Sequence, residues 1–334
     1  MRIFLTGASG YIGKELCLRL RAEGHELRAL VRATSQTKAL TEIGVATFTG
    51  DILERASMRE GMSGADWVVH AAAELDLNSP EARMAGANVD GSENVASLAS
   101  KLGVGRFLSI SSIAAFGGSP DDGSPATESS PPFLPLPTRY SRTKAAGEER
   151  VQEWARRGLK VNTVYPSLVY GPPGKKRGAN TLLRALMLGR FPALIAPDKQ
   201  ASWVFLDDLV DGIVRVMQQA PPGRNFLLTG ESWTVRKLAH RVADLSGGKV
   251  PKRELSVRTA RNLFRIAGPL LGLFGKRLPM PLEQLDSLDR NWSFDDSRAR
   301  TELGWKPRGL EEGLPVILDY LRQQEEMAGQ LTAG

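Results

Sequence analysis

A glycine-rich turn lies between the first apolar run of the chain and its first helical pattern. Residues 3–6 (IFLT) predict a buried strand, and residues 12–23 predict an amphipathic helix. The sequence that joins them is Gly7-Ala8-Ser9-Gly10-Tyr11-Ile12-Gly13. Glycines let a backbone turn tightly and let another group approach it closely. This strand–turn–helix unit indicates a parallel α/β sheet with the turn at the carboxyl edge of its strands.

The alternation of strands and helices continues along the first half of the chain. Apolar runs predict further strands at 26–31, 46–49, 67–71, 106–111 and 160–165, and helical patterns lie near 53–63, 80–102 and 138–157. Continuous apolar runs are typical of strands buried on both faces of a parallel sheet. We therefore expect a doubly wound α/β fold, the Rossmann fold, over residues 1–172.

The pattern changes after residue 172. Residues 173–334 predict a smaller, mainly helical lobe that binds the substrate, with strand-like runs at 203–206 and 225–229. We expect residues 201–230 to contribute to the first domain as well. Residues 117–137 are rich in Gly, Pro and Ser and predict a long loop, which in a compact domain is usually functional.

Composition narrows the choice of partners. Lys and Arg number 44 against 37 Asp and Glu, a net charge of +7 that favours an anionic partner such as a phosphate cofactor, nucleic acid or a membrane surface. The single Cys17 excludes an intramolecular disulfide, and three scattered histidines predict no metal site. The sequence has no signal-peptide pattern and no long apolar run, so we expect a cytoplasmic protein. We also expect that it binds no nucleic acid.

The glycine turn also predicts a cofactor. A pyrophosphate is favoured at a helix N-terminus, where backbone N–H groups point outward and the helix dipole is positive. The spacing here is G-x-x-G-x-x-G, and a purely structural turn is the alternative reading. Its position directly after the first strand favours dinucleotide binding. The expected contacts are Gly7, Ser9, Gly10, Tyr11, Ile12 and Gly13.

The end of the second strand bears on which dinucleotide is bound. NAD-binding proteins usually place a carboxylate there to accept a hydrogen bond from the ribose 2′-hydroxyl. Here the strand ends in Val31-Arg32, and Lys38 follows six residues later. A guanidinium pairs well with a 2′-phosphate, although a solvated surface arginine is the alternative. We predict NADP(H) in preference to NAD(H), with Arg32 and Lys38 as contacts.

A tyrosine and a lysine are spaced for proton transfer. Tyr140 and Lys144 share a helix face, and a nearby cation lowers a phenol pKa from its usual value of about 10. Such a pair can move a proton to or from a carbonyl oxygen, although Y-x-x-x-K also occurs by chance. Upstream, Ser112 ends the strand at 106–111, where it can donate to a substrate oxygen or merely end the strand in a turn.

Taken together, these motifs resemble the extended branch of the short-chain dehydrogenase/reductase superfamily over nearly the whole chain. The further matching segments are Gly50-Asp51-Ile52, His70-Ala71-Ala72-Ala73, Asn88-Val89-Asp90-Gly91-Ser92, Ser111–Gly117, Tyr165–Pro172, Phe205–Leu209 and Glu302–Pro307.

The resemblance implies roles for several residues. It implies Ser112, Tyr140, Lys144 and Asn88 as catalytic residues, with Lys144 also on the ribose and Asn88 supporting a proton-relay water. It implies further cofactor contacts at Asp51, Ile52, Ala71, Ala72, Ala73, Pro166 and Val169. It also implies an NAD(P)-dependent oxidoreductase that acts on CH–OH or C=O groups. A homodimer formed through the helices at 80–102 and 138–157 is a further implication.

The departures from the family pattern bear on the substrate. Phe116 replaces the usual Tyr and Tyr165 the usual Arg. Val31 and Ala201 stand where sugar-nucleotide epimerases carry an acid and a phosphate-binding Arg. These changes place the chain closer to dihydroflavonol reductases and 3β-hydroxysteroid dehydrogenases.

The apolar stretch at 263–282 is interrupted by Pro and Gly and has three readings: an ordinary core helix, a lid over an apolar pocket, or a segment that contacts a membrane. Phe116 and Trp203, with Met84 and Phe133, are the expected apolar lining of the substrate pocket. The basic run at 173–178 could attract an anionic part of the substrate.

We expect NADP(H)-dependent reduction of a fairly apolar ketone, or oxidation of the corresponding alcohol. The alternatives are a nucleotide-sugar epimerase or dehydratase and a non-catalytic NADP-sensing module.

Overall fold

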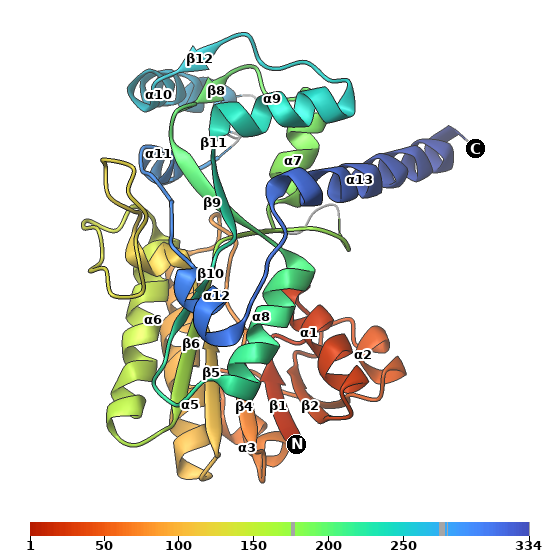
Figure 1. The fold of residues 1–334 in the computed structure, drawn as a ribbon, viewed down its shortest axis with the longest axis vertical. Coiled ribbons are helices and arrows are strands. Elements are labelled where there is room, and N and C mark those ends of the chain that lie inside the picture. Colours follow the sequence, from red (N-terminus) through yellow and green to blue (C-terminus); the bar gives the residue numbers. More distant parts are fainter. Residues whose placement is uncertain (175–177, 274–277, 279, 334) are drawn as a thin grey trace.

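The computed structural model describes residues 1–174, 178–273, 278 and 280–333. Figure 1 shows a lower body built on a large sheet and an upper lobe of helices and small sheets. The large sheet has seven parallel strands in the order β10-β6-β5-β4-β1-β2-β3. The strands are β1 (Arg2–Thr6), β2 (Glu26–Val31), β3 (Ala46–Thr49), β4 (Trp67–His70), β5 (Arg106–Ile110), β6 (Val161–Pro166) and β10 (Phe226–Leu228). The predicted doubly wound fold is confirmed.

Helices cover both faces of this sheet, because neighbouring residues of a strand point to opposite sides. Ile3 and Leu5 of β1 pack into one apolar cluster, and Phe4 between them packs into another. The first cluster includes α1 (Tyr11–Ala22), α2 (Lys38–Glu42), α8 (Leu206–Gln219) and α12 (Ser297–Leu303). The second includes α3 (Arg55–Met62), α5 (Gly91–Lys101) and α6 (Arg139–Arg156).

The strand order reverses at β1, whose two neighbours are β2 and β4. Consecutive connections leave β1 in opposite directions there, which opens a crevice at the carboxyl ends of the strands. The glycine turn follows β1 and the run Ala71–Ala73 follows β4, so both lie at this crevice.

The upper lobe has its own small sheets and core. One sheet has the order β11-β9-β7 and the other pairs β12 with β8. Its strands are β7 (Leu168–Tyr170), β8 (Leu194–Ile195), β9 (Gln200–Phe205), β11 (Glu231–Thr234) and β12 (Glu254–Leu255). Its helices are α7 (Asn180–Met187), α9 (Val235–Ser246), α10 (Val257–Leu273), α11 (Leu282–Leu288) and α13 (Leu310–Ala333). None of the helices formed by the described residues has the length and apolar character needed to cross a membrane.

Two predicted segments have more detail than the sequence suggested. The helical pattern at 80–102 is divided into α4 (Glu81–Ala85), the π-helical turn η1 (Gly86–Asp90) and α5. The loop at 117–137 follows the 3₁₀ turn η2 (Ile113–Phe116), and Arg290 of the upper lobe fixes both of its ends. The Arg290 guanidinium donates to the carbonyls of Gly117, Phe133 and Pro135 at 2.8, 2.6 and 2.5 Å.

Candidate functional site

The glycine turn brings backbone against backbone at the crevice. Gly7 has φ +76, and a Cβ there would lie 2.6 Å from the backbone of Ala71 and Ala72. A Cβ on Gly13 would lie 2.2 Å from the carbonyl oxygen of Gly7. Among the described residues, no side chain caps α1 at Gly10 and no acid lies in its first turn. Open N–H groups and the absence of competing carboxylates fit a bound pyrophosphate.

The turn is also connected to the upper lobe. The Tyr11 hydroxyl donates to the carbonyl of Gly171, and Asn180 Nδ2 donates to that carbonyl at 2.7 Å and to the Gly174 carbonyl at 2.9 Å. Burial raises the Tyr11 pKa, so this phenol stays protonated. Asn180 Nδ2 also donates to the Tyr11 hydroxyl at 3.2 Å. No local pattern indicated Asn180, because its contact with Tyr11 joins residues that are 169 positions apart.

Arg32 follows β2 as an exposed residue. Its backbone N–H donates to Ser35 Oγ at 3.1 Å, and its guanidinium has no hydrogen bond or ion pair within the described part of the chain. Lys38 is also exposed, and its Nζ lies 3.8 Å from Glu42 Oε1. The Arg32 guanidinium is therefore available to an anion at the end of β2, and the exposed Lys38 adds positive charge nearby.

Ser112, Tyr140 and Lys144 come together at the carboxyl edge of β5. The Tyr140 phenol lies close enough to the Ser112 hydroxyl for the two to interact, and Ser112 Oγ accepts from the N–H of Ala114 at 3.1 Å. The Lys144 ammonium is buried and donates to the carbonyl of Ile110 at 3.1 Å. Thr138 caps α6 by accepting from the N–H of Ser141, which fixes the helix start beside Tyr140.

Burial governs the protonation of this group. Although the Tyr140 residue retains some exposed surface, desolvation of its phenol raises the pKa to about 12, against a smaller lowering by the Ser112 hydrogen bond. Desolvation lowers the Lys144 pKa to about 8, opposed by the negative charge of Glu148. The sequence predicted a lowered phenol pKa beside the lysine. The shift has the opposite direction, because burial outweighs the lowering by Ser112.

A partly buried carboxylate lies one helical turn beyond the lysine. Glu148 accepts from the Ser111 hydroxyl at 2.8 Å and from the Tyr165 hydroxyl at 2.5 Å. Desolvation raises the Glu148 pKa, and the two hydrogen bonds and the Lys144 charge oppose this rise. Sequence reasoning missed Glu148, although its position four residues after Lys144 was a usable signal.

Asn88 is buried in η1 and holds the segment after β4. Its Oδ1 accepts from the Glu74 N–H at 2.8 Å, and its Nδ2 donates to the Glu74 carbonyl and to Thr143 Oγ1, each at 3.1 Å. Its backbone faces Gly147, where a Cβ would lie 1.9 Å from the Asn88 carbonyl oxygen. The side chain therefore ties η1 and α6 to the segment after β4.

The buried His70 connects Thr6, which precedes the glycine turn, to Ser92 in α5. His70 Nδ1 lies 2.7 Å from Thr6 Oγ1, which accepts from the Ala72 N–H at 3.3 Å. His70 Nε2 lies 3.0 Å from Ser92 Oγ, which itself donates to the Asn88 carbonyl at 2.7 Å. Because the Ser92 proton is used on Asn88, Nε2 donates to Ser92 Oγ, and in the neutral imidazole Nδ1 then accepts from the Thr6 hydroxyl. Burial lowers the His70 pKa to about 3, which agrees with this assignment.

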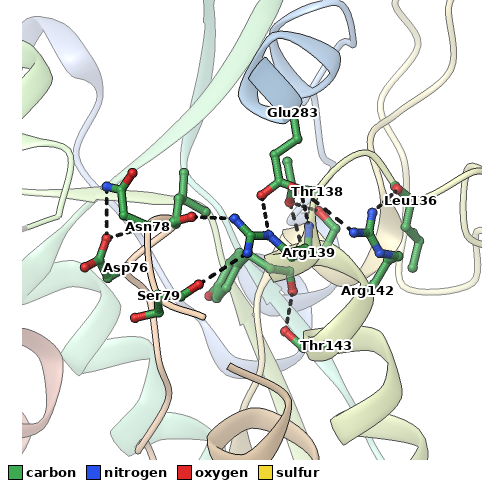
Figure 2. Close-up of polar contacts among 12 residues, drawn as sticks. Asp76, Asn78, Ser79, Leu136, Thr138, Arg139, Arg142, Thr143 and Glu283 are labelled. Carbon is green, nitrogen blue, oxygen red and sulfur yellow. Dashed lines mark hydrogen bonds and ion pairs between the residues drawn. The ribbon is translucent and has the colours of Figure 1, made fainter. Parts of the chain in front are cut away.

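Figure 2 shows the contact between the start of α6 and the upper lobe. Arg139 Nε donates to Glu283 of α11 at 2.9 Å, and the Arg139 backbone N–H donates to the same carboxylate at 3.1 Å. The guanidinium also donates to the carbonyls of Leu77 and Ser79 at 2.9 and 3.3 Å. The residue before Tyr140 therefore joins α6, the segment after β4 and the upper lobe.

The residues expected to line a substrate pocket are largely buried. Phe116 is 7% exposed and its ring packs edge-on against Tyr165, with centroids 5.0 Å apart. Trp203 is 3% exposed and packs against Tyr170 in the core of the upper lobe. Met84 is fully buried and Phe133 is partly buried. Of the basic run at 173–178, residues 175–177 lie outside the described residues.

The other predicted contacts with the cofactor border the crevice. Asp51 follows β3 and accepts from the Leu53 N–H at 2.9 Å, with Ile52 beside it. Pro166 ends β6, where it pairs with Leu228 of β10, and Val169 lies in β7. Ser9 is exposed at the turn, and Ile12 packs against the core beneath it.

Comparisons with known proteins agree with this geometry. The sequence profile described as "NAD dependent epimerase/dehydratase family" matches residues 3–228. Sterol demethylase protein B of Methylococcus capsulatus is 28% identical, with 97% of this chain and 99% of that protein covered. A 4-hydroxy-2-methyl-3-oxo-4-farnesyl-3,4-dihydroquinoline-1-oxide ketoreductase of Stigmatella aurantiaca is also 28% identical, with 97% and 96% covered. The crystal structure of gox2253 is similar with a TM-score of 0.83 and 26% identity, over 96% of this chain and 98% of that one.

A doubly wound sheet with a glycine turn at its switch point, matched over most of its length by one family, defines the class. The chain belongs to the NAD dependent epimerase/dehydratase family, the extended short-chain dehydrogenases/reductases. It is an NAD(P)-dependent oxidoreductase that acts on CH–OH or C=O groups.

Proposed function

We propose that this enzyme uses NADP(H) to reduce a ketone of a fairly apolar small molecule, or to oxidise the corresponding secondary alcohol. The observation that carries the proposal is the placement of the Ser112 and Tyr140 hydroxyls close to one another, with the buried Lys144 at the carboxyl edge of β5. A hydroxyl pair can hold a carbonyl oxygen and deliver a proton to it.

The protonation state of Tyr140 supports the direction of reduction. Because its pKa is raised to about 12, the phenol carries its proton at neutral pH and can donate it to the oxygen of a carbonyl substrate. Ser112 would orient that oxygen, and the Lys144 ammonium would stabilise the phenolate left behind. Gly7, Gly13 and the N-terminus of α1 would hold the pyrophosphate of the cofactor, and NADP(H), when bound, supplies or accepts the hydride.

The preference for NADP(H) rests on the end of β2. Arg32 is exposed there, and within the described residues its guanidinium has no partner. A guanidinium recognises a phosphate through paired, charge-assisted hydrogen bonds, whereas a ribose 2′-hydroxyl is better served by a carboxylate. Arg32 would therefore bind the 2′-phosphate, with Lys38 adding positive charge.

The apolar character of the substrate is supported by two relatives. Their names describe a sterol demethylase component and a farnesyl quinoline-oxide ketoreductase. Ala201 lies in β9, where a nucleotide-sugar enzyme of the family would carry an arginine for the nucleotide phosphate.

We also propose, from the family, a homodimer formed through α4, α5 and α6, which light scattering would test.

The test is a panel of apolar ketones, secondary alcohols and nucleotide sugars, followed at the NADPH absorbance. Net oxidation of NADPH by an apolar ketone supports a reductase. Turnover of a nucleotide sugar without net redox change would identify an epimerase, and tight NADPH binding without any turnover would identify a sensor.

Two tyrosine variants assign the proton donor. Tyr140→Phe should keep NADPH affinity and lose roughly 10²–10⁴-fold in kcat. Tyr170→Phe is the matched control, since the buried Tyr170 hydroxyl has no hydrogen-bond partner among the described residues, and it should retain activity. Comparable activity of the Tyr140 variant would rule out the proposed proton transfer.

A further inference from the structure

Helix α10 carries an uncovered row of apolar side chains. Leu263, Ile266 and Leu270 are 53%, 67% and 54% exposed. Their spacing of three and four residues places them on one side of the helix. The opposite side packs through Val257 and Ala260 into a small cluster with α11. The stretch that the sequence left open therefore has a core side and a separate side that the protein leaves in solvent.

A basic row runs beside the apolar one. Arg258 and Arg265 are both exposed, seven residues apart, and border the apolar row on the same helix. Neither has a hydrogen bond or ion pair with any described residue. Residues 249–273 contain six Lys or Arg and one Asp or Glu, so this segment contributes +5 of the net charge of +7. The one acid, Glu254, is paired with Arg236 of α9.

We propose that the α10 patch, defined as Arg258, Leu263, Arg265, Ile266 and Leu270, docks on the surface of an anionic lipid bilayer. A helix that lies in the bilayer interface inserts an apolar face and places cations among the headgroups. Arginine side chains at the border of such a face can lay their apolar stems along it and keep their charge in the headgroup layer. Figure 1 shows α10 at the outer end of the upper lobe, far from the large sheet, so a flat surface can reach it.

Size and charge favour a lipid surface over a second copy of the chain. Three partly exposed side chains cover far less than the ~800 Å² per partner that a stable protein interface buries. In a symmetric dimer through this patch, the same cations of both copies would approach one another and repel. Anionic headgroups neutralise them instead, at about 1 kcal/mol for each Lys or Arg near the surface.

The test is flotation of the full chain with vesicles, and it needs no turnover. Vesicles of phosphatidylcholine alone are compared with vesicles that contain 30% phosphatidylserine, about a third of the lipid, at low salt and at about 1 M salt. Wild type should bind the anionic vesicles at least tenfold better than the neutral ones, and high salt should weaken the binding.

Two patch variants and two controls locate the contact. The triple variant Leu263→Ser, Ile266→Ser, Leu270→Ser and the double variant Arg258→Glu, Arg265→Glu should each reduce the partition coefficient roughly tenfold or more. The apolar control is Leu18→Ser with Val316→Ser, and the charge control is Arg59→Glu with Lys101→Glu. All four control positions are exposed on other helices, and these variants should bind as wild type does, apart from the smaller effect of net charge.

Three results would overturn the proposal: wild type that binds no anionic vesicle, patch variants that bind as wild type, or a dimer that light scattering shows dissociating only in the triple variant. The last result would assign the patch to a second copy. Thermal unfolding checks that each variant is folded. If the triple variant is unfolded, the charge variant, whose changes touch no packed side chain, decides the matter.

Discussion

Glu148 is expected to set the pH range of the enzyme through Lys144. Glu148 lies one turn after the lysine, and Ser111 and Tyr165 donate to its carboxylate and favour its ionised form. Its negative charge opposes the desolvation that lowers the Lys144 pKa to about 8. Glu148→Gln keeps the shape and removes the charge. The ammonium should then lose its proton at a lower pH.

The size of the effect follows from the helix geometry. Side chains four residues apart on a helix are about 6 Å from each other. At an effective dielectric constant of about 20, two unit charges at that distance interact by about 3 kcal/mol. One pKa unit corresponds to about 1.4 kcal/mol, and the partial exposure of Glu148 reduces the interaction. We therefore expect the Lys144 pKa to fall by about one to two units.

The assay is the pH dependence of kcat/KM for NADPH, which reports the groups of the free enzyme. In wild type the alkaline limb should lie near pH 8, and in Glu148→Gln it should move to about pH 6–7. Tyr165→Phe removes one donor to the carboxylate and should move the limb in the same direction by less. Glu149→Gln is the matched control, since Glu149 is exposed and pairs with Arg156.

The reasoning fails if the alkaline limb of Glu148→Gln coincides with that of wild type while the variant is folded. A uniform loss of activity at every pH, with an unchanged limb, would show that Glu148 only supports the structure. Glu148→Asp, which restores a carboxylate on a shorter side chain, should move the limb back toward the position it has in wild type.

Three further perturbations test the rest of the site. Arg32→Asp should cost about tenfold or more in NADPH affinity relative to NADH, measured by fluorescence titration, and equal affinities in wild type would remove Arg32 from the site. Gly13→Ala should destabilise the protein by about 1–3 kcal/mol in urea unfolding, because its Cβ would lie 2.2 Å from the Gly7 oxygen, whereas Gly86→Ala, with no neighbour nearer than 3.8 Å, should not. Since the His70 pKa is lowered to about 3 in the folded state, its contribution to stability is complete above about pH 6.5 and is lost as pH falls toward 3, by roughly 1.4 kcal/mol per pH unit. His70→Asn should lack this part of the acid slope, and an unchanged slope would show that the imidazole is not buried in its neutral form.

Local sequence patterns were enough to predict the features of this protein that depend on neighbours along the chain. The alternation of apolar runs and helices predicted the parallel sheet, because a strand buried on both faces needs a continuous apolar run. The glycine turn after β1 was recognisable from its spacing, and Gly13 is required by a close contact with the Gly7 carbonyl within one strand–turn–helix unit. The close contact of Gly7 with Ala71 and Ala72, by contrast, comes from the tertiary structure. The spacing of Tyr140 and Lys144 placed both on one side of a helix.

The surroundings of those residues follow from the packing of segments that are far apart in the chain. The hydrogen bond from Tyr165 to Glu148 and the contact of Arg139 with Glu283 join segments separated by 17 and 144 residues. No local pattern encodes such pairs, because they depend on how α6 packs against β6 and against the upper lobe. The direction of the Tyr140 pKa shift depends on desolvation, which is a property of the packed site. The stretch at 263–282 was equally ambiguous in sequence, and the exposure of Leu263, Ile266 and Leu270 on α10 is evident only from how the described parts of the chain pack.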